Sequence, residues 1–190
     1  RSNVEFLDGS GIETNRFGLV YDAEGNNVTD AQAALGEEAK AHAAANQKSY
    51  TDDLSAKITK YFADASDIAP VEVSTFGTLV SALSFKSNSA EYYAFYSRSM
   101  GFHQMDVYFV LDANGAIYKM DAQQFIFEEE YFMNFGGMNE TEYKTGFEGI
   151  TTDTWTGEQA IIATATMTSN AVKQSTTDVF AAFATIKIGG

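Results

Sequence analysis

The chain lacks several residue types that common functional sites require. It has no cysteine in 190 residues, which excludes disulfides, cysteine-bound metals and thiol nucleophiles. Its two histidines, His42 and His103, have no acidic residue at a spacing typical of a metal site, and we expect His42 to be exposed. There is no Gly-x-Ser-x-Gly motif and no apolar run long enough to span a bilayer. The sequence therefore predicts no catalytic constellation, no metal site and no direct membrane insertion.

Basic residues are also few, with 12 lysines and arginines against 26 acidic residues and a formal net charge of −14. Nucleic acid and anionic lipid surfaces require clustered basic side chains, so neither is an expected partner. The acidity is typical of a solvated surface. Hydrophobic residues make up 45% of the chain, which indicates a globular protein with a sizeable core.

The first part of the chain, residues 1–70, is predicted to contain two short strands and two helices. The strands are expected at residues 4–7 and 17–21, and the helices at about 29–47 and 52–65, the first of them starting with a capping box at Thr29. The single proline, Pro70, marks the end of this helical region. We interpret residues 1–70 as an N-terminal extension or as part of the same domain.

Residues 71–190 have the pattern of a sheet followed by a helix. Strands are predicted at residues 79–85, 91–97, 105–111 and 116–120, with a tight turn at 112–115 and a short helix at 139–147. Tight turns between consecutive strands imply antiparallel pairing. The expected fold class is α+β, with a twisted antiparallel sheet packed against a C-terminal helix and two N-terminal helices beside it.

A stretch of small and hydroxyl-bearing residues precedes the C-terminal helix. It runs from Ala163 through Thr166 to Ser169, and apolar residues at helical spacing continue to about residue 185. Thr168 or Ser169 is expected to cap this helix. The amides and the positive dipole end at such a helix start favour an anion, for example the phosphate of a cofactor.

The segment Ala165-Thr166-Met167-Thr168-Ser169 resembles the C-terminal motif of the FMN-binding domains in Rnf and Nqr electron-transport subunits and related extracytoplasmic flavoproteins. That motif reads roughly Asp-x-x-(Ser/Thr)-Gly-Ala-Thr-x-Thr-Ser. The resemblance implies that a flavin transferase esterifies FMN through its phosphate to Thr166, and that Thr164, Thr168 and Ser169 contact the phosphate. Three positions differ from the motif, namely Ala160 for Asp, Ala163 for Ser or Thr, and Thr164 for Gly.

The resemblance covers roughly residues 90–185 and suggests further flavin contacts. Gly101 lies in a glycine-containing link between two strands, and it is a cofactor-binding candidate on that basis. Trp155, the single tryptophan, is expected either to wall the flavin site or to anchor a loop. The aromatic residues between 125 and 135 either stack on the flavin or pack the sheet.

The resemblance implies an electron carrier rather than a catalyst in its own right. FMN would carry the electrons, while the protein fixes the ring and sets its potential. The expected partners are redox proteins or a membrane electron-transport complex, and the expected location is extracytoplasmic, with membrane anchoring, as in a lipoprotein, through a removed N-terminal segment. One alternative is a flavin-free ligand-binding or structural cell-surface domain of the same fold. Another is an unrelated lipid- or peptide-binding domain that uses an aromatic-rich sheet.

Overall fold

A computed structural model describes residues 4–6, 13–15, 33–73, 77–101, 104–123, 139–162 and 165–188. The chain divides into two compact units, Arg1–Ser49 and Tyr50–Gly190. In the first unit, strand β1 (Val4–Phe6) pairs antiparallel with β2 (Glu13–Asn15). The strand predicted at residues 4–7 is thus confirmed, whereas the strand predicted at 17–21 and the capping box at Thr29 lie outside the described residues.

One helix, α1 (Ala33–Tyr61), replaces the two N-terminal helices that the sequence predicted. The expected break near residues 48–51 contains no glycine or proline, so nothing in the backbone ends the helix there. Side chains from this segment also bind the sheet. The Thr51 hydroxyl lies 3.1 Å from that of Ser81, and the Tyr50 hydroxyl accepts a 2.7 Å hydrogen bond from Arg98. The prediction of two helices was therefore wrong.

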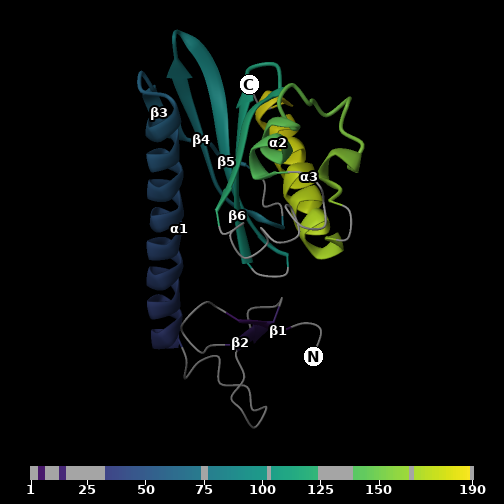
Figure 1. The fold of residues 1–190 in the computed structure, drawn as a ribbon. Helices are drawn as coiled ribbons and strands as arrows, with labels where there is room; N and C mark the ends of the chain where they lie inside the picture. Colours follow the sequence, from purple (N-terminus) through teal and green to yellow (C-terminus); the bar gives the residue numbers. More distant parts are fainter. Residues whose placement is uncertain are drawn as a thin grey trace. The chain divides into compact units, whose positions relative to one another are not determined.

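The second unit is built on a five-stranded antiparallel sheet with strand order β3-β4-β5-β6-β7 (Figure 1). Its members are β3 (Ser66–Pro70), β4 (Leu79–Ser87), β5 (Ala90–Met100), β6 (Gln104–Asp112) and β7 (Ile117–Gln123). The four predicted strands and their antiparallel pairing are confirmed. Strand β3 was not predicted, and its Pro70 is tolerated because the strand lies at the edge of the sheet.

The hairpin between β6 and β7 forms at the predicted turn. The Asp112 carboxylate accepts hydrogen bonds from the backbone amides of Asn114 (2.8 Å) and Ala116 (3.0 Å). Gly115 has a φ of +85°, which glycine adopts without strain. A Cβ at this position would lie 3.2 Å from Phe183 Cδ1, so the glycine also makes room for the C-terminal helix.

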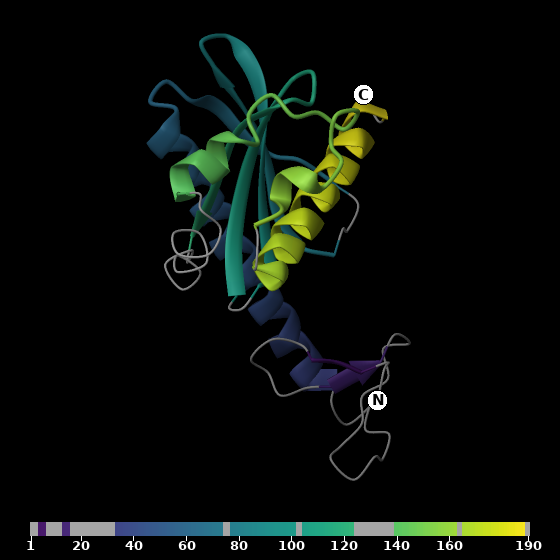
Figure 2. The ribbon, with the colours of Figure 1, turned by 45° about the vertical axis from the view of Figure 1, so that its right-hand side comes forward.

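Helices cover both faces of the sheet, as Figure 2 shows from a second angle. One face carries α3 (Thr166–Ile188) and the short helix α2 (Glu140–Thr145), which confirms the predicted C-terminal and 139–147 helices. The other face packs against Leu54 and Ile58 of α1 and against Phe62, which directly follows the helix. Alternation along β5 divides its side chains between the two cores, with Phe95 in the first and Ala94 and Tyr96 in the second.

Helix α3 runs antiparallel to β5. Tyr93 near the start of β5 packs edge-to-face against Phe183 near the end of the helix. Ser97, further along β5, donates a 2.8 Å hydrogen bond to Ser175. The last residues of β5 therefore lie at the end of the sheet where α3 begins. Strand β7 also ends there, because Gln123 pairs with Asp106 in register.

Candidate functional site

Helix α3 begins at Thr166, two residues before the expected caps. Thr168 and Ser169 therefore lie inside the first turn, and the prediction that one of them caps the helix was wrong. The Ser169 hydroxyl accepts a 2.8 Å hydrogen bond from the amide of Ile162 and donates a 2.8 Å bond to the carbonyl of Ala165. Ser169 thus ties the preceding loop to the helix instead of capping it.

The residues of the threonine motif differ sharply in exposure. Thr166 is exposed and Met167 is 54% exposed, whereas Thr168 and Ser169 are 1% and 3% exposed. Of the motif hydroxyls in the described part of the chain, that of Thr166 is the one presented to solvent. Thr164, like Ala163, lies outside the described residues.

The first turn of α3 contains no acidic residue, although the chain carries a net charge of −14. The positive end of the helix dipole is therefore not neutralised by a carboxylate of that turn. Gly101 directly follows β5 and is buried, at the end of the sheet where α3 starts. The structure thus places Gly101 and Thr166 at the same end of the domain.

Trp155 precedes α3 in the sequence and lies beside the second half of that helix. Its indole packs against Phe147 and Phe180, with ring centroids 6.1 and 6.3 Å away, and its Nε1 donates a 3.2 Å hydrogen bond to the Thr177 hydroxyl. Thr177 is roughly 16 Å along the helix axis from Thr166, at a rise of about 1.5 Å per residue. Trp155 therefore anchors its loop to the second half of the helix, and these contacts do not bring it to Thr166.

Ala160, where the resembling motif has aspartate, is fully buried within the core beside α3. Its carbonyl accepts a 2.9 Å hydrogen bond from the hydroxyl of Tyr143, and burial raises the pKa of that phenol. An aspartate at this position would place a carboxylate in apolar surroundings, which is costly without a partner. The alanine suits the packing of this chain.

Sequence reasoning missed the contact between Lys173 of α3 and Gly157 of the loop that precedes the helix. Gly157 has a φ of +83°, and a Cβ on it would lie 2.7 Å from Lys173 Nζ and 3.1 Å from its Cδ. The lysine side chain therefore lies directly over the bare glycine. A glycine after Thr156 and a lysine seven residues beyond Thr166 were visible in the sequence, but nothing there indicated that they touch.

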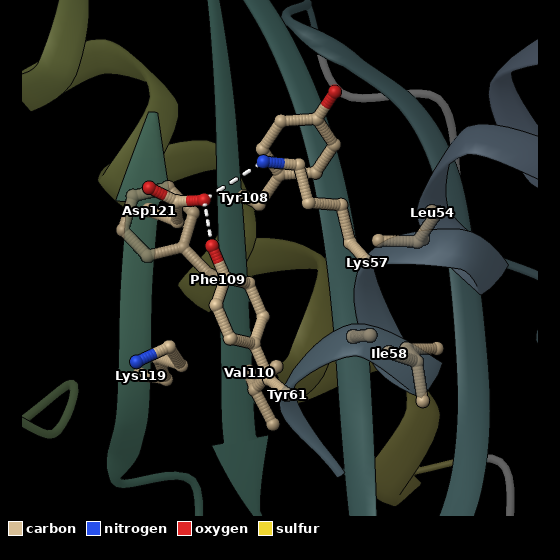
Figure 3. Close-up of a pocket in the computed structure, with 10 residues that line it drawn as sticks. Leu54, Lys57, Ile58, Tyr61, Tyr108, Phe109, Val110, Lys119 and Asp121 are labelled. Carbon is tan, nitrogen blue, oxygen red and sulfur yellow. Dashed lines mark hydrogen bonds and ion pairs between the residues drawn. The ribbon is translucent and has the colours of Figure 1, made fainter. Parts of the chain in front are cut away.

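A charged cluster centred on Asp121 lies on the face of the sheet that packs against α1. The sequence did not predict this cluster either. Lys57 and Lys144 donate hydrogen bonds of 2.8 and 2.7 Å to its carboxylate, and the Tyr61 hydroxyl donates a further one. Lys144 also pairs with Glu140. Figure 3 shows Lys57 and Tyr61 of α1 directed at Asp121 of β7, and these three residues line a small pocket together with apolar side chains such as Leu54 and Ile58.

Burial alone would raise the pKa of Asp121, but the hydrogen bonds from Lys144, Lys57 and Tyr61 hold it well below its ordinary value. Desolvation and the hydrogen bond to Asp121 raise the pKa of the Tyr61 phenol. Desolvation likewise raises the pKa of the neighbouring Tyr108 to about 12. Asp121 therefore stays ionised and saturated with donors, so it joins α1, β7 and α2 and is poorly suited to proton transfer.

Within the described ranges there is no group of three or more histidine, cysteine or acidic side chains that could hold a metal ion. The described helices include none that is both long and apolar enough to cross a membrane. Comparison with protein-family models and with curated proteins found no match to this chain.

Proposed function

We propose that residues 71–190 form an FMN-bearing electron-transfer domain in which the phosphate of the flavin is esterified to Thr166. The observation that carries the proposal is the exposure of Thr166 at the first position of a well-packed helix, next to buried Thr168 and Ser169. A modifying enzyme needs access to one hydroxyl, and this arrangement presents one.

The residues at the start of α3 suit a phosphate ester. A 23-residue helix directs its positive dipole end toward Thr166, and its first turn has no carboxylate to repel an anion. The Ser169 hydroxyl is engaged with Ile162 and Ala165, so its role would be to hold the loop that presents Thr166. Thr168 and Gly101 would shape the surroundings of the phosphate from buried positions, and Thr164 would contribute a further contact to it.

When bound, FMN supplies one- or two-electron chemistry. The chain would bind and orient the flavin, while a rigid sheet with helices on both faces would hold the attachment point in place. The proposal assigns none of the described side-chain clusters a role in transferring protons to or from the flavin. The domain would therefore act as a carrier between other redox centres rather than as a catalyst.

The proposal extends to location and partners. Covalent attachment suits a protein outside the cytoplasm, where flavin lost by dissociation is not easily replaced. There, anchored at a membrane, the domain would exchange electrons with redox proteins or with a membrane electron-transport complex.

Co-expression with a flavin transferase tests the attachment. We expect the purified protein to be yellow and to gain the mass of one FMN less one water, and we expect a Thr166→Ala variant to gain nothing. If the wild-type protein gains no mass and stays colourless after soaking in free FMN, the electron-transfer proposal is refuted. The fold would then serve a flavin-free ligand-binding or structural role.

A further inference from the structure

An open hollow of about 460 Å³ lies at the hairpin between β6 and β7, at the edge of the sheet. Its volume falls within the range of about 300–1,000 Å³ that is typical of small-molecule sites. At this edge the backbone of Ile117 exchanges hydrogen bonds with Gly149 and Ile150. The residues that line the hollow include Asp112, Tyr118, Lys119, Glu148 and Gly149.

A β-bulge places an aromatic ring in this hollow. The register of β7 against β6 shifts by one residue between Ile117 and Lys119, so Tyr118 is an extra residue in the strand. Such bulges change the direction of a side chain and are common beside active sites. Tyr118 is 52% exposed, and it packs against Phe62 and Tyr92, whose ring centroids lie 5.5 and 5.1 Å away. The two rings therefore hold Tyr118 in place and leave part of it open to a ligand.

Polar groups surround the exposed ring. Asp112 uses one carboxylate oxygen for the turn amides, and no donor in the described part of the chain reaches the other. Glu148 is exposed. The Lys119 ammonium lies 4.6 Å from the centroid of the Tyr61 ring, which orders the lysine side chain. Gly149 has a φ of +82°, and nothing lies within 4 Å of where its Cβ would be, so the backbone there is bare.

These groups suit a neutral ligand with many hydroxyl groups. Two carboxylates against one ammonium group disfavour an anion. A quaternary ammonium ligand requires a cage of several rings, but Tyr118 is the one aromatic residue among the described residues that line the hollow. Sugar hydroxyls donate to carboxylates and accept from an ammonium group. The C–H face of a pyranose also packs well against an aromatic ring, whose face is negative and apolar.

We propose that this hollow binds a β-linked oligosaccharide of glucose or N-acetylglucosamine, whose pyranose rings have all their substituents equatorial and therefore present C–H faces. One ring stacks on Tyr118, and its hydroxyls bond to Asp112, Glu148 and Lys119. This binding is independent of the flavin. Gly115 of the same hairpin lies against Phe183, roughly 25 Å along α3 from Thr166 at a rise of about 1.5 Å per residue.

The test titrates the full chain, without flavin, with cellohexaose and with chitohexaose while its backbone amide NMR spectrum is recorded. We expect at least one of the two sugars to shift the amides of Tyr118, Lys119 and Gly149, with a dissociation constant of about 1 mM or below. Tyr118→Ala should weaken this binding by about three- to tenfold, whereas Tyr118→Phe should keep it, because the ring makes the contact. Ile161→Ala is the matched control, since Ile161 is 48% exposed but does not line the hollow. It should bind as the wild type does.

Three results would overturn the carbohydrate site. The first is that neither sugar shifts these amides at up to about 10 mM. The second is that Tyr118→Ala binds as tightly as the wild type. The third is that choline shifts the same amides and the sugars do not, which would make the hollow a cation site. If Tyr118→Ala does not fold, Glu148→Gln supplies the comparison, because it removes one charged acceptor at an exposed position. That variant should bind about threefold more weakly, and an unchanged affinity refutes the inference.

Discussion

Replacing Asp121 by asparagine removes a carboxylate that two lysines and a tyrosine share. The side chains of Asp121, Lys57 and Lys144 are only 13%, 14% and 18% exposed, so the charges are largely shielded from water. Lys144 would keep Glu140 as an ion-pair partner, whereas Lys57 would lose its ion pair and keep only its position 4.7 Å from the centroid of the Tyr108 ring and 5.9 Å from that of Tyr61. The asparagine oxygen can still accept one hydrogen bond, for example from Tyr61.

From this geometry we expect the Asp121→Asn variant to lose about 2 to 3 kcal/mol of unfolding free energy, somewhat less than the roughly 3–5 kcal/mol of breaking a fully buried pair. Urea unfolding followed by tryptophan fluorescence measures this loss. Trp155 is the single tryptophan, and it packs against Phe147 and Phe180 in the same unit as Asp121. Its emission therefore reports the unfolding of that unit.

The same carboxylate predicts a dependence on pH. The folded pKa of Asp121 is lowered, because the hydrogen bonds from the two lysines and Tyr61 outweigh the effect of burial. A carboxylate with a lowered pKa contributes all its stability above its unfolded pKa of about 3.9, and this stability is lost as pH falls through the folded value. The wild-type advantage over Asp121→Asn should therefore persist at pH 5 and above and shrink below about pH 4.

Lys86→Gln is the control for this prediction. Lys86 pairs with Asp67 at 2.9 Å, but the two side chains are 55% and 66% exposed. Such surface pairs contribute about 0–1 kcal/mol, so this variant should stay within roughly 0.5 kcal/mol of wild type. The reasoning is refuted if Asp121→Asn is as stable as the control, or if its stability falls as steeply in acid as that of the wild type.

Three further substitutions test the packing around α3 by urea unfolding. Ser169→Ala should cost about 1–3 kcal/mol, because it leaves the buried amide of Ile162 without its acceptor; a loss below about 0.5 kcal/mol would contradict the loop-tying role. Gly115→Ala should cost about 1–3 kcal/mol through its positive φ and the clash with Phe183, and an unchanged midpoint would show that the ring yields freely. Tyr143→Phe should cost about 1 kcal/mol by removing the buried hydrogen bond to a core carbonyl, and no loss would mean that this bond contributes nothing.

The sheet could be predicted from the sequence because its signals are local. The alternation in β4, the apolar run of β6 and the turn ending in Gly115 all lie within short windows. Strand β3 was missed because it is short, mostly exposed and ends at a proline, which makes it resemble a loop. Only its pairing with β4 makes it a strand.

The two errors in the helices have a common physical cause, since tertiary contacts decided both. Helix α1 continues through its polar segment where Tyr50 and Thr51 bind the sheet, and these partners lie far away in the sequence. At the start of α3 several hydroxyl residues compete for the cap. The bond from Ile162 to Ser169 settles the boundary in favour of Thr166, and the sequence did not reveal that bond.

Only part of the candidate site could be predicted, because only part of it has a local signal in the sequence. The motif around Thr166 is contiguous and was recognised from its letters, whereas its exposure came from the structure. The contact of Lys173 with Gly157 depends on a loop conformation with positive φ, and the bond between Lys57 and Asp121 joins residues 64 positions apart. Neither pairing has a local signature in the sequence.

Peptide mapping of the co-expressed, purified protein tests the central claim most directly. Trypsin cleaves after Lys144 and Lys173 and releases residues 145–173, which contain the whole threonine motif. We predict that this peptide carries the mass of one FMN less one water and that fragmentation places the added mass on Thr166. An unmodified peptide 145–173, or an added mass on any other residue, would contradict the account.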